Sequence, residues 1–572
     1  MSSSPSGRRP RAPRRFSRRT TLQAAAGVAA AALVTGGRAW PAGAAEEATP
    51  VPGALPDLRG VAPLPLSGAL LATFEAYVAA KLAEFHVPGA AVAVVQGGEV
   101  TFLQGFGVRE LGRPAPVTTD TLLRIGSITK SFSSLLAATV VDTGRLSWET
   151  PLVDLLPSFA VADSALTPRL TLADAFCACT GLPRRDWQLI LNARALTPER
   201  VIADMATLPL TTPYGEQFQY NNQMVAAGGY AAAVADGGSP DDLGHAYAIA
   251  LRARVLDPLG MGRSALALAE VLGGGNYAIP HSAGLSGALQ PLPLLEDDVW
   301  VSAVGPSGAL WSSAAEMARY VQTELRRGVN PDGVRVVSTE NLERTWRPGV
   351  ALPTPPPGTP PALATFGEHY GLGWVVGSYG GQRLVWHTGA THGFHALLTL
   401  LPEADLGAVV LTNATIGMSG TFTTAVQLRL LELLFDLPAT IDAAQAAGPA
   451  AAAAQARDAL LSQLGTVDSA LVAPFLGRYT NPALGEMTLA LRDGALVFDA
   501  GSVRSAMRPQ LGADGAVIAY LFVDPPLGGF PPELTVSLTR DAAGRPQPVL
   551  TAATGPGEAA EVYAYEPVAA GA

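Results

Sequence analysis

The sequence predicts an α+β fold followed by an all-β domain. A strand, a tight turn and a second strand are predicted over residues 91–103. Further strand-like segments lie within residues 370–412, and a helical pattern over 422–434 follows them. After residue 456, short alternating segments separated by Asp-Gly turns replace this mixture and indicate a separate β domain. With 572 residues, 48% of them hydrophobic, the chain is long enough to build two cores.

Residues 1–44 have the pattern of an export signal. They contain eight arginines and no acidic residue, and SRRTTLQ at positions 17–23 resembles a twin-arginine motif. A mildly apolar run over 24–34 and small residues at 42–44 complete the pattern. We therefore expect a bacterial protein exported to the periplasm or the exterior, with a disordered basic tail as the alternative.

The charge of the chain restricts its partners. Loss of residues 1–44 would change the formal net charge from −10 to about −18, which disfavours binding to nucleic acid or to anionic lipid. No apolar run after residue 44 approaches the ~20 residues of a membrane span. No Walker loop, dinucleotide fingerprint or nucleophile elbow occurs, so we expect no cofactor.

The cysteines and histidines suggest neither a disulfide nor a metal site. Cys177 and Cys179 are predicted at the end of a short helix over 172–177, where residues two apart diverge. We interpret both as small, buried apolar side chains. His392 and His395 are three residues apart in a strand context, which does not match metal-ligand spacing, and we interpret the pair as chance.

The chain divides where its composition changes. Residues 45–67 are proline-rich and predict a flexible lead-in. Residues 68–437 form the predicted α+β domain. An alanine-rich linker over 438–469 leads to the β domain, 470–572, for which a barrel and a sandwich are both open.

Helices of the α+β domain are predicted over 70–85, from Met224 onward, and after a capping box that begins at Ser313. A loop is predicted over 304–310. The later strands are predicted at residues 370–374, 383–386, 394–401 and 406–412.

Residues 124–144 predict a helix with Ser127 on its first turn and Lys130 on the same face. Gly144 is a plausible end of this helix. The chain contains 38 basic residues, yet only Lys81 and Lys130 are lysines. Lysine can lose its proton when buried, whereas arginine cannot, so Lys130 is a candidate for proton transfer to or from Ser127. The alternative is a capping serine beside a solvated lysine.

Tyr220 and Asn222 are predicted in a loop at a helix start. A lysine ammonium nearby would favour the phenolate and lower the pKa of Tyr220. Asn222 can donate and accept hydrogen bonds, which suits holding both Lys130 and a substrate amide. A structural turn that uses asparagine is the alternative.

His387, Thr388, Gly389 and Ala390 begin the strand-rich end of the domain. Gly389 would let a ligand approach the backbone closely. If this strand borders the site, the N–H of Ala390 could pair with that of Ser127 as an oxyanion hole. His387 could be neutral or cationic.

Three short motifs, in this order, resemble the active-site motifs of the serine β-lactamase and D-alanyl-D-alanine peptidase superfamily. They are Ser127-x-x-Lys130, Tyr220-x-Asn222 and His387-Thr388-Gly389. The last two are similar to those of the class C-like branch, with its D-aminopeptidases, carboxypeptidases and carboxylesterases. The resemblance spans residues 68–437 and implies an antiparallel sheet flanked by helices with an all-helical subdomain. Residues 475–485 are similar to lipocalin-like appendages.

The resemblance implies a hydrolase in which Ser127 forms an acyl-enzyme. Tyr220, with Lys130, would take the proton of Ser127 and later pass one to the leaving group. The residues implied to bind the substrate are Asn222, His387, Thr388, Gly389 and Ala390. The substrate would be a D-amino-acid peptide amide or a small carboxylic ester, a cell-wall fragment being one candidate.

Two departures from the family pattern stand out. The third motif begins with His387 where β-lactamases carry a lysine, which favours peptidase or esterase activity. Ala178 replaces a histidine that many members carry. A true β-lactamase and a noncatalytic penicillin-binding-type sensor or scaffold are the alternatives.

Overall fold

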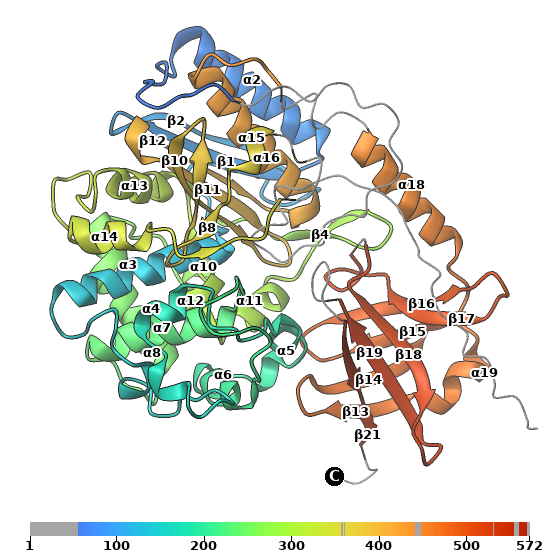
Figure 1. The fold of residues 1–572 in the computed structure, drawn as a ribbon. Helices are drawn as coiled ribbons and strands as arrows, with labels where there is room; N and C mark the ends of the chain where they lie inside the picture. The colour runs from blue at the N-terminus through green and yellow to red at the C-terminus, as the bar shows by residue number, and fades with distance from the viewer. Residues whose placement is uncertain are drawn as a thin grey trace, which may run out of the picture.

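The computed structural model describes residues 55–355, 359, 361–440, 448–529, 531–553 and 560–568. The expected export signal and residues 45–54 of the expected lead-in lie outside this part. Figure 1 shows a sheet with helices on both faces and a barrel beside it, which confirms the predicted fold class. Among the described residues, none of the helices is both long and apolar enough to cross a membrane.

An eight-stranded antiparallel sheet is the centre of the larger unit, in the order β2-β1-β12-β11-β10-β9-β8-β7. The hairpin near the start of the chain thus joins the strands near residue 412, with Ala90 opposite Thr412. The strands are β1 Gly89–Gln96, β2 Glu99–Gly107, β7 Val350–Ala351, β8 His369–Tyr370, β9 Val375–Tyr379, β10 Gln382–Ala390, β11 His395–Leu401 and β12 Leu406–Thr412.

The predicted strand at 370–374 is interrupted. β8 ends at Tyr370 and β9 begins at Val375, because Gly373 has a φ of +82°. A Cβ atom on Gly373 would lie 2.9 Å from the backbone oxygen of Lys130. Glycine at this position therefore lets the sheet approach the helix that carries Lys130.

Helices cover both faces of the sheet. α2 (Gly68–Glu84) and α16 (Ile416–Leu434) lie on one face, and α13 (Ala314–Leu325) lies on the other. Successive residues of β1 point to opposite faces, so Val92 packs with α2 and α16 whereas Ala91 packs with α13. The helices predicted over 70–85 and 422–434 and after Ser313 are confirmed.

Residues 55–67, which the sequence assigned to a flexible lead-in, pack against this unit. Leu58 and Leu66 are buried in the cluster under α2 and α16. The N–H of Leu58 donates to the Gly380 oxygen at 2.7 Å, and that of Leu66 donates to Gln96 Oε1 at 3.0 Å. These apolar anchors and hydrogen bonds hold the segment on the sheet.

A helical subdomain lies beside the sheet (Figure 1). Residues 304–310, predicted as a loop, contain a short helix, α12. The principal helices of the subdomain are α3 Thr129–Asp142, α4 Leu172–Phe176, α5 Asp186–Leu191, α6 Pro198–Asp204, α7 Asn222–Ala235, α8 Leu243–Leu251, α11 Leu294–Ser302 and α12 Gly305–Gly308.

The C-terminal strands form a nearly closed antiparallel barrel in the order β20-β19-β18-β17-β16-β15-β14-β13-β21. β20 pairs with β19, and β21, one residue further on, pairs with β13, so this segment bridges the two edges. The structure therefore favours the barrel over the sandwich. The strands are β13 Gly477–Asn481, β14 Gly485–Arg492, β15 Ala495–Asp499, β16 Arg504–Leu511, β17 Val517–Phe522, β18 Leu534–Arg540, β19 Pro546–Ala552, β20 Glu561–Ala564 and β21 Glu566–Pro567.

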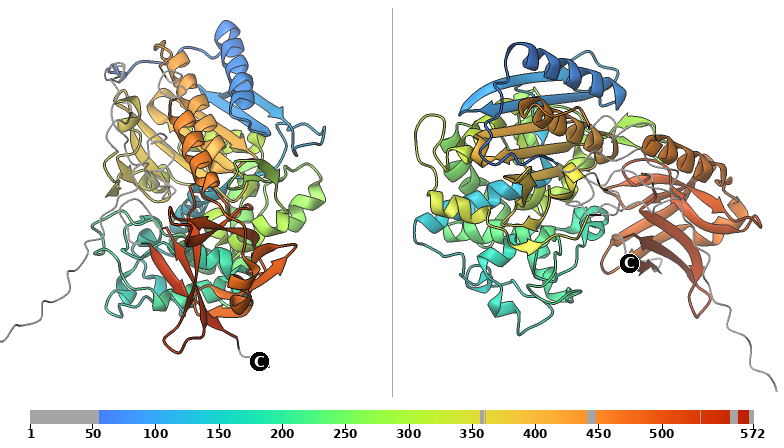
Figure 2. Two further views of the ribbon diagram at one scale, coloured as in Figure 1. Left: turned by 90° about the vertical axis from the view of Figure 1, so that its right-hand side faces the viewer. Right: turned by 45° about the horizontal axis from the view of Figure 1, so that its top comes forward.

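The segment predicted as an alanine-rich linker is partly helical. Helix α18 spans Gly448–Ser462, and Figure 2 shows it beside the barrel. Leu460 and Leu461 pack near Leu521 of β17. Alanine has the highest helix propensity, so the composition that suggested a linker also favours a helix.

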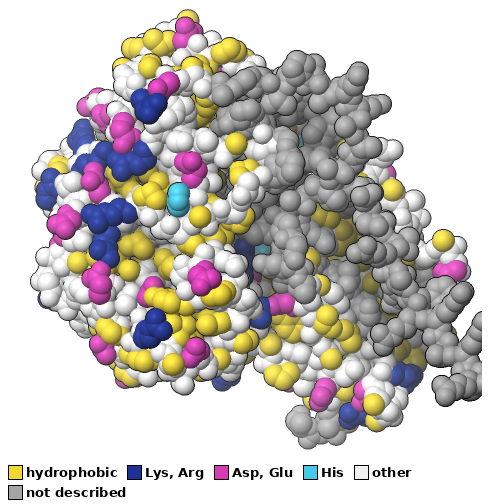
Figure 3. Space-filling view, in the orientation of Figure 1, with side chains coloured by type: hydrophobic (Ala, Val, Ile, Leu, Met, Phe, Trp, Pro, Cys, Tyr) yellow, Lys and Arg dark blue, Asp and Glu magenta, His cyan; other side chains and the backbone are white. Residues whose placement is uncertain are grey.

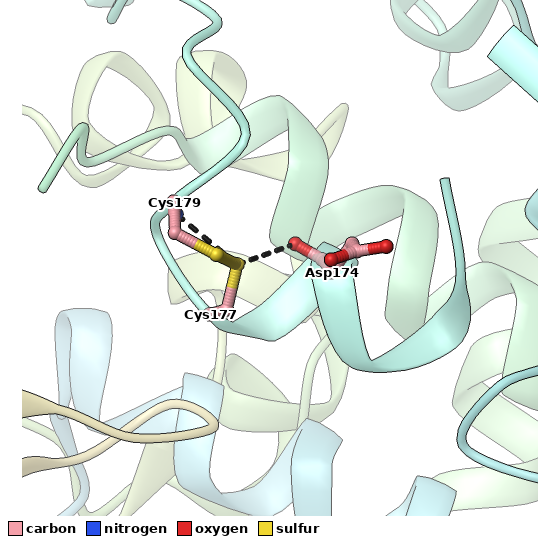
Figure 4. A group of neighbouring side chains, drawn as sticks. All are labelled: Asp174, Cys177 and Cys179. Atoms are coloured by element: carbon pink, nitrogen blue, oxygen red, sulfur yellow. Dashed lines mark hydrogen bonds between the residues drawn. A yellow bond between two sulfur atoms is a disulfide. The ribbon is translucent and has the colours of Figure 1, made fainter. Parts of the chain in front are cut away.

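The expectation of two free cysteines is wrong. Cys177 and Cys179 form a disulfide (Figure 4). Helix α4 ends at Phe176, and Ala178 adopts a φ of +51°, which turns the chain and brings the two Cα atoms to 5.3 Å. That separation is within the range a disulfide spans. The prediction failed because it placed both residues in one helix.

The disulfide also bears on metal binding. In the described part of the chain, Asp174, Cys177 and Cys179 bring three possible ligand atoms within 4.8 Å of one another (Figure 4). Metals bind cysteine as the thiolate, and these sulfur atoms are bonded to each other. The cluster is therefore a disulfide next to a capping aspartate.

Charged side chains of both signs are mixed on the face of the molecule in Figure 3. Many arginines of the described residues pair with acids, for example Arg344 with Glu149 at 2.6 Å and Arg327 with Glu343 at 2.7 Å. A nucleic-acid interface requires a continuous basic surface. This face does not have one among its described residues.

Candidate active site

Ser127 lies where the helix predicted over 124–144 begins. A 3₁₀ turn, Gly126–Ile128, leads directly into α3. The neighbouring residues of this turn are buried, whereas Ser127 is half-buried, so its hydroxyl reaches the surface of an otherwise buried helix start. Gly144 follows the end of the helix with a φ of +73°, as predicted.

Lys130 is completely buried and is surrounded by oxygen atoms. Its Nζ lies 3.0 Å from Ser127 Oγ, 2.7 Å from Asn222 Oδ1 and 2.7 Å from the backbone oxygen of Ser307. The alternative of a solvated lysine is therefore wrong. Burial lowers the pKa of Lys130 well below its usual value; the Asp186 carboxylate opposes this shift and the Arg184 guanidinium adds to it.

The partners of Lys130 determine what a neutral amine would do here. Asn222 Nδ2 donates to Asp186 Oδ1 at 2.8 Å, so Asn222 presents its carbonyl oxygen to Lys130. That oxygen and the Ser307 carbonyl can only accept hydrogen bonds. A neutral Lys130 would donate its two N–H bonds to them and direct its lone pair at the hydroxyl of Ser127.

Tyr220 also contacts the serine. Its hydroxyl donates to Ser127 Oγ at 2.8 Å, and Lys130 Nζ lies 4.8 Å from the centre of its ring. We predicted a lowered pKa for Tyr220, and this is wrong. Burial raises the pKa and outweighs the opposing effects of Arg184 and of the hydrogen bond with Ser127. Tyr220 is therefore a protonated donor.

Two charged residues that the sequence did not single out border this cluster. Asp186 accepts from Asn222, and Arg184 Nε donates to Asp186 at 2.5 Å. The Arg184 guanidinium lies 5.1 Å from the centre of the Tyr220 ring. Both precede or begin the short helix α5, and no motif marks them. Ser307 lies in the predicted loop over 304–310, within the part of the chain that the family resemblance covers.

His387 is fully buried on β10 and is neutral. Its Nδ1 faces the carbonyl oxygen of Thr388, which can only accept, so Nδ1 carries the proton. Its Nε2 then accepts from the Tyr370 hydroxyl at 2.9 Å. Burial is the main cause that lowers the pKa of His387 to about 3. The neutral alternative is thus supported.

The other residues of the third motif lie on different faces of β10. Gly389 lies against the helix start, since a Cβ on it would be 1.8 Å from the Ile125 oxygen and 3.0 Å from the Ser127 nitrogen. A Cβ on Gly126 would lie 2.4 Å from the Ala390 nitrogen. Thr388 points to the opposite face, where it lines a small cavity toward α16, so its side chain is not part of the Ser127 cluster.

The chain is similar in sequence to known proteins. The family model for β-lactamases matches residues 74–432. The chain belongs to the β-lactamase family. Penicillin-binding protein 4 of Amycolatopsis lactamdurans is 30% identical over 336 residues, which cover 59% of this chain and 83% of that protein. An unguisins hydrolase of Aspergillus campestris is 27% identical over 375 residues, or 64% of this chain and 65% of that protein.

The similarity in fold covers more of the chain than the similarity in sequence. The octameric penicillin-binding protein homologue from Pyrococcus abyssi has a TM-score of 0.54 and 20% sequence identity, and it covers 86% of this chain and 99% of its own. The match extends beyond the 63% of residues within the family model, so the similarity in fold includes part of the C-terminal region.

In this β-lactamase-family member, the backbone around the Cys177–Cys179 disulfide holds the loop that leads to Tyr220. The Ala178 carbonyl accepts from the Gln219 N–H at 2.7 Å, immediately before Tyr220. The Cys179 carbonyl accepts from the Gly215 N–H at 2.8 Å. The disulfide therefore closes the turn against which the Tyr220 loop is held.

Proposed function

We propose that the protein is a serine hydrolase that forms an acyl-enzyme on Ser127 and acts on D-amino-acid peptide amides or small carboxylic esters. One observation carries the proposal: Ser127 Oγ lies within hydrogen-bond distance of both Lys130 Nζ and the Tyr220 hydroxyl. A nucleophile needs a base and a proton donor for the leaving group. The lowered pKa of Lys130 suits it to accept a proton, and the raised pKa of Tyr220 suits it to donate one.

Lys130 is the base in this proposal. Burial favours its neutral form, and its two carbonyl partners leave the lone pair for the Ser127 proton. As the Ser127 oxygen attacks the substrate carbonyl, that proton moves to Lys130 Nζ. Tyr220, which stays protonated, then donates to the leaving group and recovers a proton from Lys130. Asn222 keeps the amine oriented throughout.

The oxyanion would be stabilised by backbone groups. The Ser127 nitrogen and the Ala390 nitrogen belong to segments that touch at Gly126 and Gly389. Two N–H donors at the edge of the nucleophile are the usual arrangement for a tetrahedral intermediate. Gly389 would serve this arrangement because it has no Cβ that would separate the strand from the helix start.

His387 directs the proposed substrate away from β-lactams. The family resemblance places a lysine cation here in β-lactamases, whereas His387 is neutral and occupied by Tyr370. A site without this cation would bind a substrate carboxylate less strongly. The β-lactamase and noncatalytic alternatives remain distinguishable by the experiment below.

We further infer export to an oxidising compartment. The Cys177–Cys179 disulfide supports this, since disulfides persist mainly in such compartments. Replacement of Arg18 and Arg19 by lysine should retain the protein in the cytoplasm. Unchanged export of that variant would contradict a twin-arginine signal.

The test is a substrate panel of p-nitrophenyl esters, D-alanyl anilides and nitrocefin, applied to the wild type and to Ser127→Ala. We expect steady turnover of an ester or an anilide that Ser127→Ala abolishes, and little hydrolysis of nitrocefin. A single stoichiometric burst without turnover would support the sensor alternative. Nitrocefin as the best substrate would support the β-lactamase alternative.

A further inference from the structure

Helix α5, Asp186–Leu191, is shared between the candidate active site and the barrel. Its first residue, Asp186, accepts from Asn222, the residue that orients Lys130. Its last residue, Leu191, is 1% exposed and lies in the hydrophobic cluster of the barrel. Figure 1 shows α5 at the side of the helical subdomain that faces the barrel. One helix of six residues therefore touches both places.

The barrel holds this helix by polar contacts as well. Ser502 Oγ donates to the backbone oxygen of Ile190 at 3.0 Å. Arg185, immediately before α5, forms an ion pair with Glu561 at the start of β20. The second oxygen of Glu561 accepts from the Tyr563 hydroxyl at 2.6 Å.

The Arg185–Glu561 pair differs from most ion pairs on the surface. Its side chains are only 19% and 15% exposed, whereas the barrel pair Arg478–Glu486 is more than half exposed on both sides. Ion pairs that are shielded from water and anchored by a further hydrogen bond hold their geometry better than exposed ones. The pair is thus suited to fixing the start of α5.

We propose that the C-terminal barrel positions the catalytic lysine: Glu561 fixes Arg185, which holds Asp186 against Asn222 and so aligns Lys130 with Ser127. This inference rests on the proposed function, because it assigns a task within the same site. Arg185 and Glu561 are positioning residues, which act on Lys130 through Asp186 and Asn222.

The charges around Lys130 give the proposal a specific signature. Asp186 and Arg184, both next to Arg185, act in opposite directions on Lys130, while its other titratable neighbours, Tyr220 and His387, are neutral. If Asp186 moves away, Lys130 loses the carboxylate that raises its pKa. The limb of the pH–rate profile that follows Lys130 would then move to lower pH as kcat falls.

The test compares Glu561→Gln, Arg185→Gln and the double variant with the wild type. We expect each single variant to lower kcat about tenfold, because a misplaced catalytic group costs rate even when the fold is intact. The acid limb of kcat/KM should move to lower pH in each. The double variant should be no worse than either single variant, since both break the same link.

Glu486→Gln, which breaks the exposed pair with Arg478, is the matched control and should behave as the wild type. Wild-type kcat and an unshifted pH profile in Glu561→Gln would overturn the proposal, and so would additive losses in the double variant. If Glu561→Gln does not fold, Arg185→Gln tests the same ion pair from the other side, and an unshifted limb there overturns the proposal. Absence of Ser127-dependent hydrolysis in the wild type would instead refute the proposed function.

Discussion

The two lysines of this protein have different partners. Lys81, in the last turn of α2, has a side chain only 11% exposed and lies 2.9 Å from the carboxylate of Glu84. Lys130, in the first turn of α3, is buried among Ser127, Asn222 and a backbone carbonyl. Where charge is needed elsewhere, the chain uses arginine. The comparison indicates that position 130 requires a side-chain amine that can lose its proton.

The surroundings of each lysine lead to this difference. A carboxylate next to an ammonium stabilises its charged form. A buried site of neutral oxygens removes the water and favours the uncharged amine. The chemistry of the partners thus distinguishes a lysine paired with a carboxylate from a candidate base.

The largest expected effect comes from exchanging each lysine for arginine. Lys130→Arg should lower kcat by about 10³-fold or more, because a guanidinium cannot accept the serine proton. Lys81→Arg should stay within about twofold, because it keeps the charge that pairs with Glu84. Steady-state kinetics on the best ester or anilide measure both. Equal losses in the two variants would remove the basis of the comparison.

A smaller effect is expected from the tyrosines that lie near the two lysines. Lys81 Nζ lies 5.4 Å from the centre of the Tyr77 ring, and Lys130 Nζ lies 4.8 Å from the centre of the Tyr220 ring. Tyr220→Phe should lower kcat about 10²-fold, since it removes the proton donor to the leaving group. Tyr77→Phe should leave kcat unchanged. A Tyr220→Phe enzyme with the wild-type rate would show that the hydroxyl has no part in proton transfer.

The smallest expected effect concerns His395, whose burial should affect the free energy of unfolding and not the rate of hydrolysis. His395, buried on β11, is neutral because burial lowers its pKa to about 3, compared with about 6.5 in the unfolded chain. The unfolded state therefore binds more protons between these values, and stability falls as the pH falls through this window. His395→Leu should remove about 2 kcal/mol of the loss in unfolding free energy between pH 8 and pH 5.

Denaturant unfolding of the wild type and His395→Leu at the two pH values measures this difference. Turnover at pH 8 should be unchanged, because the His395 side chain is hydrogen-bonded to Thr423 of α16, on the face of the sheet opposite Ser127, although its backbone pairs with Ala390. An identical loss of stability in both proteins would show that His395 is not buried in its neutral form.

Local patterns were enough to predict most of the fold. The alternation in β1 and the glycine turn at 97–98 are contained in a few neighbouring residues. The helix start at Ser127 was equally visible, because capping and spacing are local. Composition misled at α18, where alanine fits both a linker and a helix. At Cys177 the error came from one backbone angle at Ala178 that no local pattern indicates.

The site was predictable only in part. Ser127, Lys130, Tyr220 and Asn222 come together as expected, because the family resemblance carries their relative order. Asp186 was missed, since its contact with Asn222 spans 36 residues and depends on how α5 packs. The pKa of Tyr220 was misjudged because its burial is a property of the whole fold.

The most direct test of the account is the titration of Lys130 itself. Protein labelled with ¹³C at the lysine ε carbon should show two side-chain signals, one for each lysine, and Lys130→Arg identifies which is which. We predict that the Lys130 signal titrates well below pH 10.5. A midpoint at or above pH 10.5 would mean that Lys130 stays charged, and would contradict its role as the base for Ser127.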